Sequence, residues 1–193
     1  MTGERASLPV LTIDFDGVIC SPPFGVNLGI TTAFLDPTAP PRAARVPPRW
    51  LGDALDHLRF DFRRPMPEAA AALAALHRRR RVVVLTGRRS SPLPWLRRYH
   101  LDSYVDDIAI NEGTLRSAHH KLESIERLGV REHVDDDGRT AQLLAVRAGV
   151  TVYLRDWPRN RGAAYANGVV RVTDLAEVAA RIDASGGAEL DER

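Results

Sequence analysis

Residues 8–19 read LPVLTIDFDGVI, an apolar stretch rich in β-branched residues that leads into two aspartates and a glycine. A short, continuous apolar run of this kind is typical of a strand that is buried on both faces. It predicts a first strand that ends near Asp16, before the chain turns away at Gly17. Because side chains two residues apart in a strand point to the same face, we expect Asp14 and Asp16 to begin as neighbours.

Strands and helices are expected to alternate along the rest of the chain. The pattern predicts further strands within 81–88, 105–111, 131–137, 150–154 and 168–172, and helices within 65–81, 91–101, 120–130, 140–150 and 174–182. This alternation favours an α/β, Rossmann-like fold, in which right-handed crossovers build a mostly parallel sheet with helices on both faces. Ligands bind beyond the carboxyl ends of the strands in such sheets.

Residues 20–64 interrupt the alternation. They are rich in proline, follow no steady period and contain one helical patch at 49–58. Such a segment predicts a flap or small lid inserted after the first strand. The expected organisation is one core domain made of residues 1–19 and 65–182, followed by a flexible polar tail at 183–193.

The charge balance and the cysteine content indicate which kinds of binding partner and which compartment to expect. The chain has 27 Lys and Arg against 25 Asp and Glu, and this balance does not indicate nucleic-acid binding. The arginine run at 78–81 belongs to an expected helix end and has no interleaved aromatic residues. Cys20 is the single cysteine, and the N-terminus has no long apolar run. We therefore expect a cytoplasmic protein that binds a small molecule rather than nucleic acid or a membrane.

Two groups of acidic residues fall at expected strand ends, one at Asp14 and Asp16 and the other at residues 135–137. Two carboxylates about 4 Å apart repel by roughly 4 kcal/mol at an effective dielectric of 20, and a bound cation offsets this repulsion. A single aspartate at a strand end is also a common turn residue, which is the alternative for Asp14 taken alone. Three adjacent acids are too costly to serve packing, so the pattern predicts Mg²⁺.

Four motifs occur in the order IDFDGV, LTGR, Lys121 and VDDD, and they resemble the motifs of the haloacid dehalogenase superfamily of phosphotransferases. The resemblance covers residues 9–155. It implies that Asp14 is a nucleophile that becomes an aspartyl-phosphate. It also implies that Asp16 offers its backbone carbonyl to Mg²⁺, while its side chain protonates the leaving group and later activates water. An aspartate at position 16 favours phosphate-ester hydrolysis over dehalogenation, with a phosphomutase as the alternative.

The second and third motifs supply the expected phosphate contacts. Thr86 ends an apolar run, so its hydroxyl and the backbone N–H groups after it can hold a phosphoryl oxygen. Gly87 and Arg88 are expected to contact the substrate, although Arg88 also fits a surface arginine. Lys121 matches the position where the family places a cation that neutralises the phosphate and the nucleophile.

Within the acidic run at residues 135–137, two different aspartates are candidates for the metal ligand. The family's spacing before the next Ala-Gly points to Asp137, whereas its paired-acid form points to Asp136. The predicted metal ligands are therefore Asp14 and Asp16 together with Asp136 and Asp137. Ala141 stands where many members of the family carry a further acid.

These motifs predict a magnesium-dependent phosphatase acting on a small phosphorylated metabolite. A nucleotide is one candidate, because residues 153–160, YLRDWPRN, resemble the C-terminal part of deoxyribonucleotidase-like members. In that segment Trp157, Arg159 and Asn160 either contact the substrate or close the sheet. The alternative function is a binding or scaffold module of the same fold with little turnover, and the discriminating property is metal-dependent release of phosphate.

Overall fold

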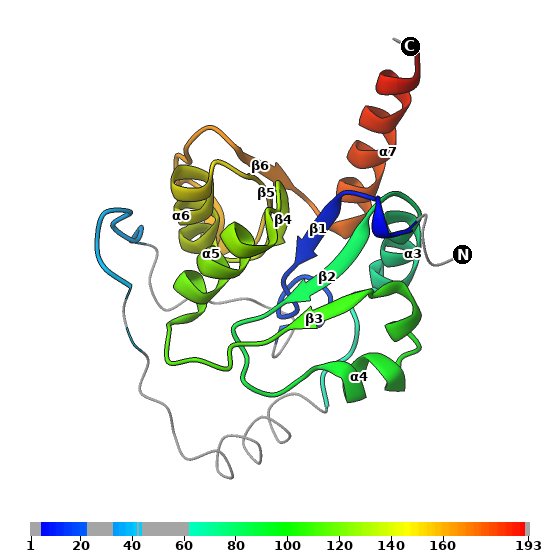
Figure 1. Cartoon of the computed structure of the whole chain (residues 1–193), viewed down its shortest axis with the longest axis horizontal. Coiled ribbons are helices and arrows are strands. Elements are labelled where there is room, and N and C mark those ends of the chain that lie inside the picture. Colours follow the sequence, from blue (N-terminus) through cyan, green and yellow to red (C-terminus); the bar gives the residue numbers. More distant parts are fainter. Residues whose placement is uncertain (1–4, 23–32, 42, 44–61, 192–193) are drawn as a thin grey trace.

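The computed structural model of the chain describes residues 5–22, 33–41, 43 and 62–191 (Figure 1). The strands are β1 (Val10–Ile13), β2 (Arg81–Leu85), β3 (Asp107–Ala109), β4 (Glu132–Asp135), β5 (Thr151–Arg155) and β6 (Val169–Val172). They form one six-stranded sheet in the order β3-β2-β1-β4-β5-β6. Every pairing between neighbouring strands is parallel. The predicted α/β class is confirmed, with a wholly parallel sheet where a mostly parallel one was expected.

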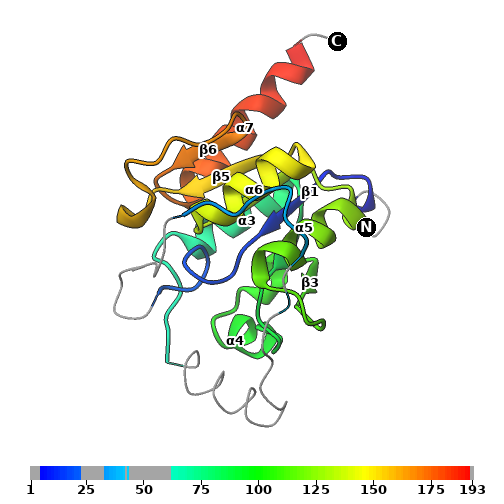
Figure 2. The ribbon, with the colours of Figure 1, turned by 90° about the vertical axis from the view of Figure 1, so that its left-hand side faces the viewer.

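Helices cover both faces of this sheet. They are α3 (Ala69–Arg79), α4 (Leu93–Arg98), α5 (Ser117–Leu128), α6 (Gly138–Ala148) and α7 (Leu175–Asp191), with short 3-10 turns η2 (Asp102–Tyr104) and η3 (Pro158–Asn160). Figures 1 and 2 show α5 and α6 on one face and α3 and α7 on the other. Among the described residues, no helix is long and apolar enough to cross a membrane.

Each face has its own apolar core. Leu73 of α3 and Val178 of α7 pack with Ile13 of β1 in one buried cluster. Leu122 of α5 and Leu144 of α6 belong to a second cluster on the opposite face. Strands covered by apolar side chains on both faces account for the continuous apolar runs in the sequence.

Local signals set the helix ends. Gly149 follows α6 with φ 63°, and Gly129 follows α5 with φ 61°. Both adopt the left-handed conformation that glycine tolerates best at a helix C-terminus. Arg80, directly after α3, pairs with Glu132 of β4 at 2.7 Å.

Several element boundaries differ from the prediction by one to three residues, and two differences change the description of the chain. Strand β1 ends at Ile13 rather than near Asp16, because the chain closes a tight loop in which the N–H of Gly17 donates to the carbonyl of Cys20 at 2.8 Å. Helix α7 continues to Asp191 and projects beyond the sheet (Figures 1 and 2). Residues 183–191 contain no proline, so no residue there removes a helical backbone donor and blocks the continuation of the helix.

The two ends of the insertion lie side by side on the core. The N–H of Ser21 donates to the carbonyl of Arg64 at 2.9 Å, and the N–H of Met66 donates to that of Ile19 at 2.8 Å. Residues 33–41 reach the α6 side of the molecule, where the ring of Phe34 lies 5.4 Å from that of Tyr165. The helical patch expected at 49–58 lies outside the described residues.

Candidate active site

The site lies where the strand order changes direction. Strands β1 and β4 are neighbours at the middle of the sheet, and the chain runs outward from β1 to β2 on one side and from β4 to β5 on the other. Ligands bind at the carboxyl ends of strands at such a switch point. Asp14 directly follows β1, and its N–H donates to the carbonyl of Val134 at 2.9 Å. The sheet therefore brings the acids of the first and fourth motifs together.

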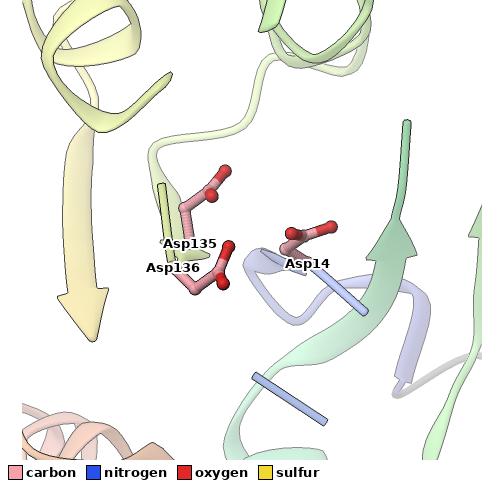
Figure 3. Close-up of side chains that lie close together, drawn as sticks. All are labelled: Asp14, Asp135 and Asp136. Atoms are coloured by element: carbon pink, nitrogen blue, oxygen red, sulfur yellow. The ribbon is translucent and has the colours of Figure 1, made fainter. Parts of the chain in front are cut away.

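Three buried carboxylates converge at this point. Asp14, Asp135 and Asp136 each offer an oxygen, and these oxygens lie within 4.8 Å of one another. Figure 3 shows Asp14 on the loop after β1, facing the two aspartates at the end of β4. Oxygen ligands of this kind suit Mg²⁺, which commonly uses one or two carboxylates together with water and substrate oxygens. The donor set fits the predicted metal.

Lys121 lies between two of these acids. Its Nζ is 3.0 Å from Asp14 Oδ2 and 2.8 Å from Asp135 Oδ2, and its side chain is 3% exposed. Helix α5 directs it there because Leu122 and Ile125, on the same helix, are buried against the sheet. Burial acts to lower the pKa of Lys121, but the charges of Asp135 and Asp14 raise this pKa above its ordinary value. The side chain is a fixed positive charge.

Asp135 anchors this arrangement. Its Oδ2 accepts from Lys121 and lies 2.9 Å from Nε2 of His133, while its Oδ1 accepts from the N–H of Asp137 at 2.9 Å. Burial acts to raise the pKa of Asp135, yet Lys121 and the His133 hydrogen bond hold it well below its usual range. His133 is itself fully buried, with Nδ1 2.8 Å from the hydroxyl of Thr12.

The other two acids have raised pKa values. Burial, followed by the charges of Asp135 and Asp16, raises the pKa of Asp14 to about 7, against the opposing charge of Lys121. Burial and the charges of Asp14 and Asp135 raise the pKa of Asp136 well above its usual range. A cation bound between Asp14 and Asp136 would favour their ionised forms. These two carboxylates are therefore the best candidates for metal ligands.

The structure separates Asp136 from Asp137. The Asp137 side chain caps α6 by accepting from the N–H of Arg139 at 3.0 Å, and it also pairs with the Arg139 guanidinium at 2.8 Å. It lies outside the group of three carboxylates found among the described residues. Ala141 is fully buried in α6. The geometry favours Asp136 as a metal ligand and gives Asp137 a structural role.

The Asp16 side chain faces two arginines instead of the carboxylate cluster. Arg88 donates from Nε to Oδ2 and from Nη2 to Oδ1, both at 2.7 Å. Arg63, at the end of the insertion, donates to Oδ1 at 2.5 Å. Burial acts to raise the pKa of Asp16, but Arg88 and then Arg63 hold it below its ordinary value. Sequence reasoning missed Arg63, because no motif connects it with Asp16.

The second motif forms the loop between β2 and the site. Thr86 is buried, its N–H donates to the carbonyl of Ala109 at 3.0 Å, and its hydroxyl accepts from the N–H of Arg88 at 3.3 Å. A Cβ on Gly87 would lie 2.1 Å from Oγ and 2.5 Å from Cβ of Ser117. Glycine is therefore required for this loop to pack against the start of α5.

The loop between β5 and β6 holds the site from the other side. Trp157 donates from Nε1 to the carbonyl of Gly17 at 3.1 Å. Asn160 donates from Nδ2 to the carbonyl of Asp136 at 2.9 Å, and Arg159 donates to the same oxygen at 2.8 Å. These contacts favour closure of the sheet, one of the two roles expected for this segment.

Cys20 is buried beside this region. Burial raises the pKa of its thiol to about 12. A thiol with so high a pKa is not an effective nucleophile at neutral pH, so the acids remain the candidates for catalysis.

Comparison with known proteins relates this architecture to solved structures. No protein-family model matches the chain, and no curated protein matches it in sequence. A haloacid dehalogenase superfamily hydrolase of subfamily IA from Geobacter sulfurreducens is 19% identical, with a TM-score of 0.54 over 89% of this chain and 98% of that chain. The D,D-heptose 1,7-bisphosphate phosphatase from B. bronchiseptica, complexed with magnesium and phosphate, is 16% identical, with a TM-score of 0.55 over 92% and 99%.

A third structure, CbbY from Rhodobacter sphaeroides in complex with phosphate, is 15% identical, with a TM-score of 0.58 over 89% of this chain and 96% of that chain. At these identities the likeness concerns the fold. The near-complete coverage of both chains agrees with the parallel sheet flanked by helices. The chain has the fold of the haloacid dehalogenase superfamily.

Proposed function

We propose that this protein is a magnesium-dependent phosphatase that hydrolyses a small phosphorylated metabolite through an aspartyl-phosphate on Asp14. The observation that carries the proposal is the buried contact of Asp14 with Lys121 at 3.0 Å, next to a second carboxylate, Asp136, that suits a metal. A nucleophilic carboxylate, a fixed cation and a metal ligand at one sheet edge are the groups that phosphoryl transfer to an aspartate requires.

Asp14 and Asp136 would hold Mg²⁺, which would supply charge stabilisation to the phosphate. The Asp14 carboxylate attacks phosphorus, and the ester oxygen departs with its electron pair and accepts a proton from Asp16. Water then attacks the aspartyl-phosphate, Asp16 takes a proton from that water, and inorganic phosphate leaves. Lys121 stabilises the negative charge shared by Asp14 and the phosphate throughout, while Thr86 binds a phosphoryl oxygen.

The pairing of Asp16 with Arg63 and Arg88 affects both proton transfers that the mechanism assigns to Asp16. The paired carboxylate is ionised, which is the form that accepts a proton from water. Proton donation to the leaving group requires Asp16 to leave the two arginines and to take up a proton from the solvent before the ester bond breaks. Arg88 is then available for the substrate contact expected of it, beside Gly87, so substrate binding and release of Asp16 are linked.

A nucleotide is the more specific substrate candidate within this proposal. It rests on the resemblance of residues 153–160 to deoxyribonucleotidase-like proteins, and the contacts of Trp157 and Asn160 with backbone carbonyls favour a structural role for these two residues. Any small phosphate ester therefore belongs in the first assay.

The test is release of inorganic phosphate from a panel of nucleoside monophosphates, sugar phosphates and p-nitrophenyl phosphate, with Mg²⁺ or with EDTA. We expect metal-dependent release by the unmodified protein, no release by Asp14→Asn, and a strong reduction for Asp16→Asn. The matched control is Asp137→Asn, whose carboxylate lies outside the cluster and whose activity should persist. Equal turnover by Asp14→Asn would refute the mechanism, and a folded protein that binds Mg²⁺ without turnover would favour the binding-module alternative.

A further inference from the structure

Arg159 makes two contacts with one residue of the cluster. Its Nη2 donates to the backbone carbonyl of Asp136 at 2.8 Å and lies 3.2 Å from the Oδ2 of the same residue. The side chains are 16% and 7% exposed, so this ion pair is shielded from water. Shielding from solvent makes such a charge contact stronger than a surface pair.

Lys121 and Arg159 make short ion pairs with different acids of the cluster. Lys121 contacts Asp14 and Asp135, whereas Arg159 contacts Asp136. They come from different elements, Lys121 from α5 and Arg159 from η3. The contact with Arg159 is therefore distinct from the two short contacts of Lys121.

The position of Asp136 does not depend on Arg159 alone. Asn160, which is 3% exposed, donates from Nδ2 to the Asp136 carbonyl at 2.9 Å, and its Oδ1 accepts from the N–H of Gly138 at 3.3 Å. These bonds fix the backbone on both sides of residue 137. Loss of the Arg159 charge therefore leaves Asp136 in place.

We propose that Arg159 is the counter-cation of Asp136 in the metal-free protein and that this contact limits the affinity of the site for divalent cations. The inference rests on the proposed function, because it takes Asp14 and Asp136 as the metal ligands. A cation that binds Asp136 competes with the guanidinium for the carboxylate. Arg159 stays attached to the Asp136 carbonyl, so its positive charge remains beside the bound cation and repels it.

The inference predicts that removal of the charge strengthens cation binding. Isothermal titration calorimetry with MgCl₂ and with MnCl₂, in phosphate-free buffer at pH 8, which favours the ionised carboxylates of the cluster, measures this without any turnover. We expect Arg159→Gln to bind each cation at least fivefold more tightly than the unmodified protein, and Arg159→Lys, which keeps the charge, to bind within twofold of it. Arg159→Met, similar in length and uncharged, is the second neutral variant in case the glutamine variant does not fold.

Arg139→Gln is the matched control. Arg139 pairs with Asp137 at 2.8 Å, one residue along the chain from Asp136, so its removal should change the cation affinity by less than twofold. Unchanged or weaker binding in the folded neutral variants at position 159, with normal binding by the unmodified protein, would overturn this inference and leave the proposed function standing. Failure of the unmodified protein to bind either cation would overturn the magnesium-dependent function and this inference with it.

Discussion

Replacing Lys121 by methionine removes a buried ammonium group from between two buried carboxylates. Each of its contacts, at 3.0 Å to Asp14 and 2.8 Å to Asp135, corresponds to an attraction of about 6 kcal/mol at an effective dielectric of 20. Much of this is offset in the native protein by the cost of burying the ions. Removing one partner of a buried pair leaves the other charge uncompensated and typically costs about 3–5 kcal/mol. We expect a loss of that size in the free energy of unfolding at pH 8.

The loss should depend on pH in a defined direction. In the unmodified protein Lys121 helps to hold the pKa of Asp135 below its usual range. Without Lys121, burial and mutual repulsion raise the folded-state pKa values of Asp14 and Asp135 above those of the unfolded chain. Stability from such groups is present at low pH and is lost as the pH rises through the folded-state pKa. The deficit of Lys121→Met should therefore be smaller at pH 5.5 than at pH 8.

Urea unfolding in EDTA at pH 5.5 and pH 8 measures both effects. Arg139→Met is the matched control, because Arg139 and Asp137 form a more exposed pair, with side chains 30% and 24% exposed. Its loss should stay below about 1 kcal/mol. A loss below about 1 kcal/mol for Lys121→Met at pH 8, or an equal loss at both pH values, would refute the electrostatic account of this site.

Three further measurements test the site and its support. Asp137→Ala should destabilise the protein by about 1 kcal/mol in urea unfolding, through loss of the α6 cap, and should leave the Mg²⁺ affinity unchanged. Asp136→Asn should abolish Mg²⁺ binding. The reverse pattern would identify Asp137 as the metal ligand. Mg²⁺ affinity measured by calorimetry should rise with pH between 6 and 7.5, because the cation needs the ionised form of Asp14, whose pKa is about 7; a flat profile would contradict that pKa. Gly87→Ala should lower the free energy of unfolding by about 1–3 kcal/mol, because the added methyl group overpacks against Ser117. Adding Ser117→Gly to this variant should restore part of the lost stability. A double variant as unstable as Gly87→Ala would show that the loss has another cause.

Local patterns predicted the elements because they depend on neighbouring residues. The apolar run before Asp14 predicted a buried strand, and the helix expected within 140–150 corresponds to α6, which ends before Gly149. Even the position of the site followed, because acids at the ends of two parallel strands must meet at one edge of the sheet. Boundaries were less certain, since β1 ends three residues before Asp16 through loop contacts that no periodic pattern reveals.

The partners of the acids could not be predicted in this way. Arg63 reaches Asp16 across 47 positions, and the buried His133 contacts Thr12 across 121. His133 and Asp135 lie two residues apart in β4 and therefore share one face of the strand, but only the register of β4 beside β1 brings His133 to Thr12. Such contacts depend on how distant elements dock, and they left no periodic signal in the sequence.

By itself, therefore, the sequence determined the α/β class, the order of the motifs and the edge of the sheet where they meet, because hydrophobic periodicity and chain direction are local properties. Tertiary structure alone decided which of two adjacent aspartates faces Asp14. Helix α6 begins at Gly138, so Asp137 turns to cap it and Asp136 is left facing the cluster. Tertiary structure also placed Arg159 against Asp136, because that contact exists only once the loop after β5 has folded back over the end of β4.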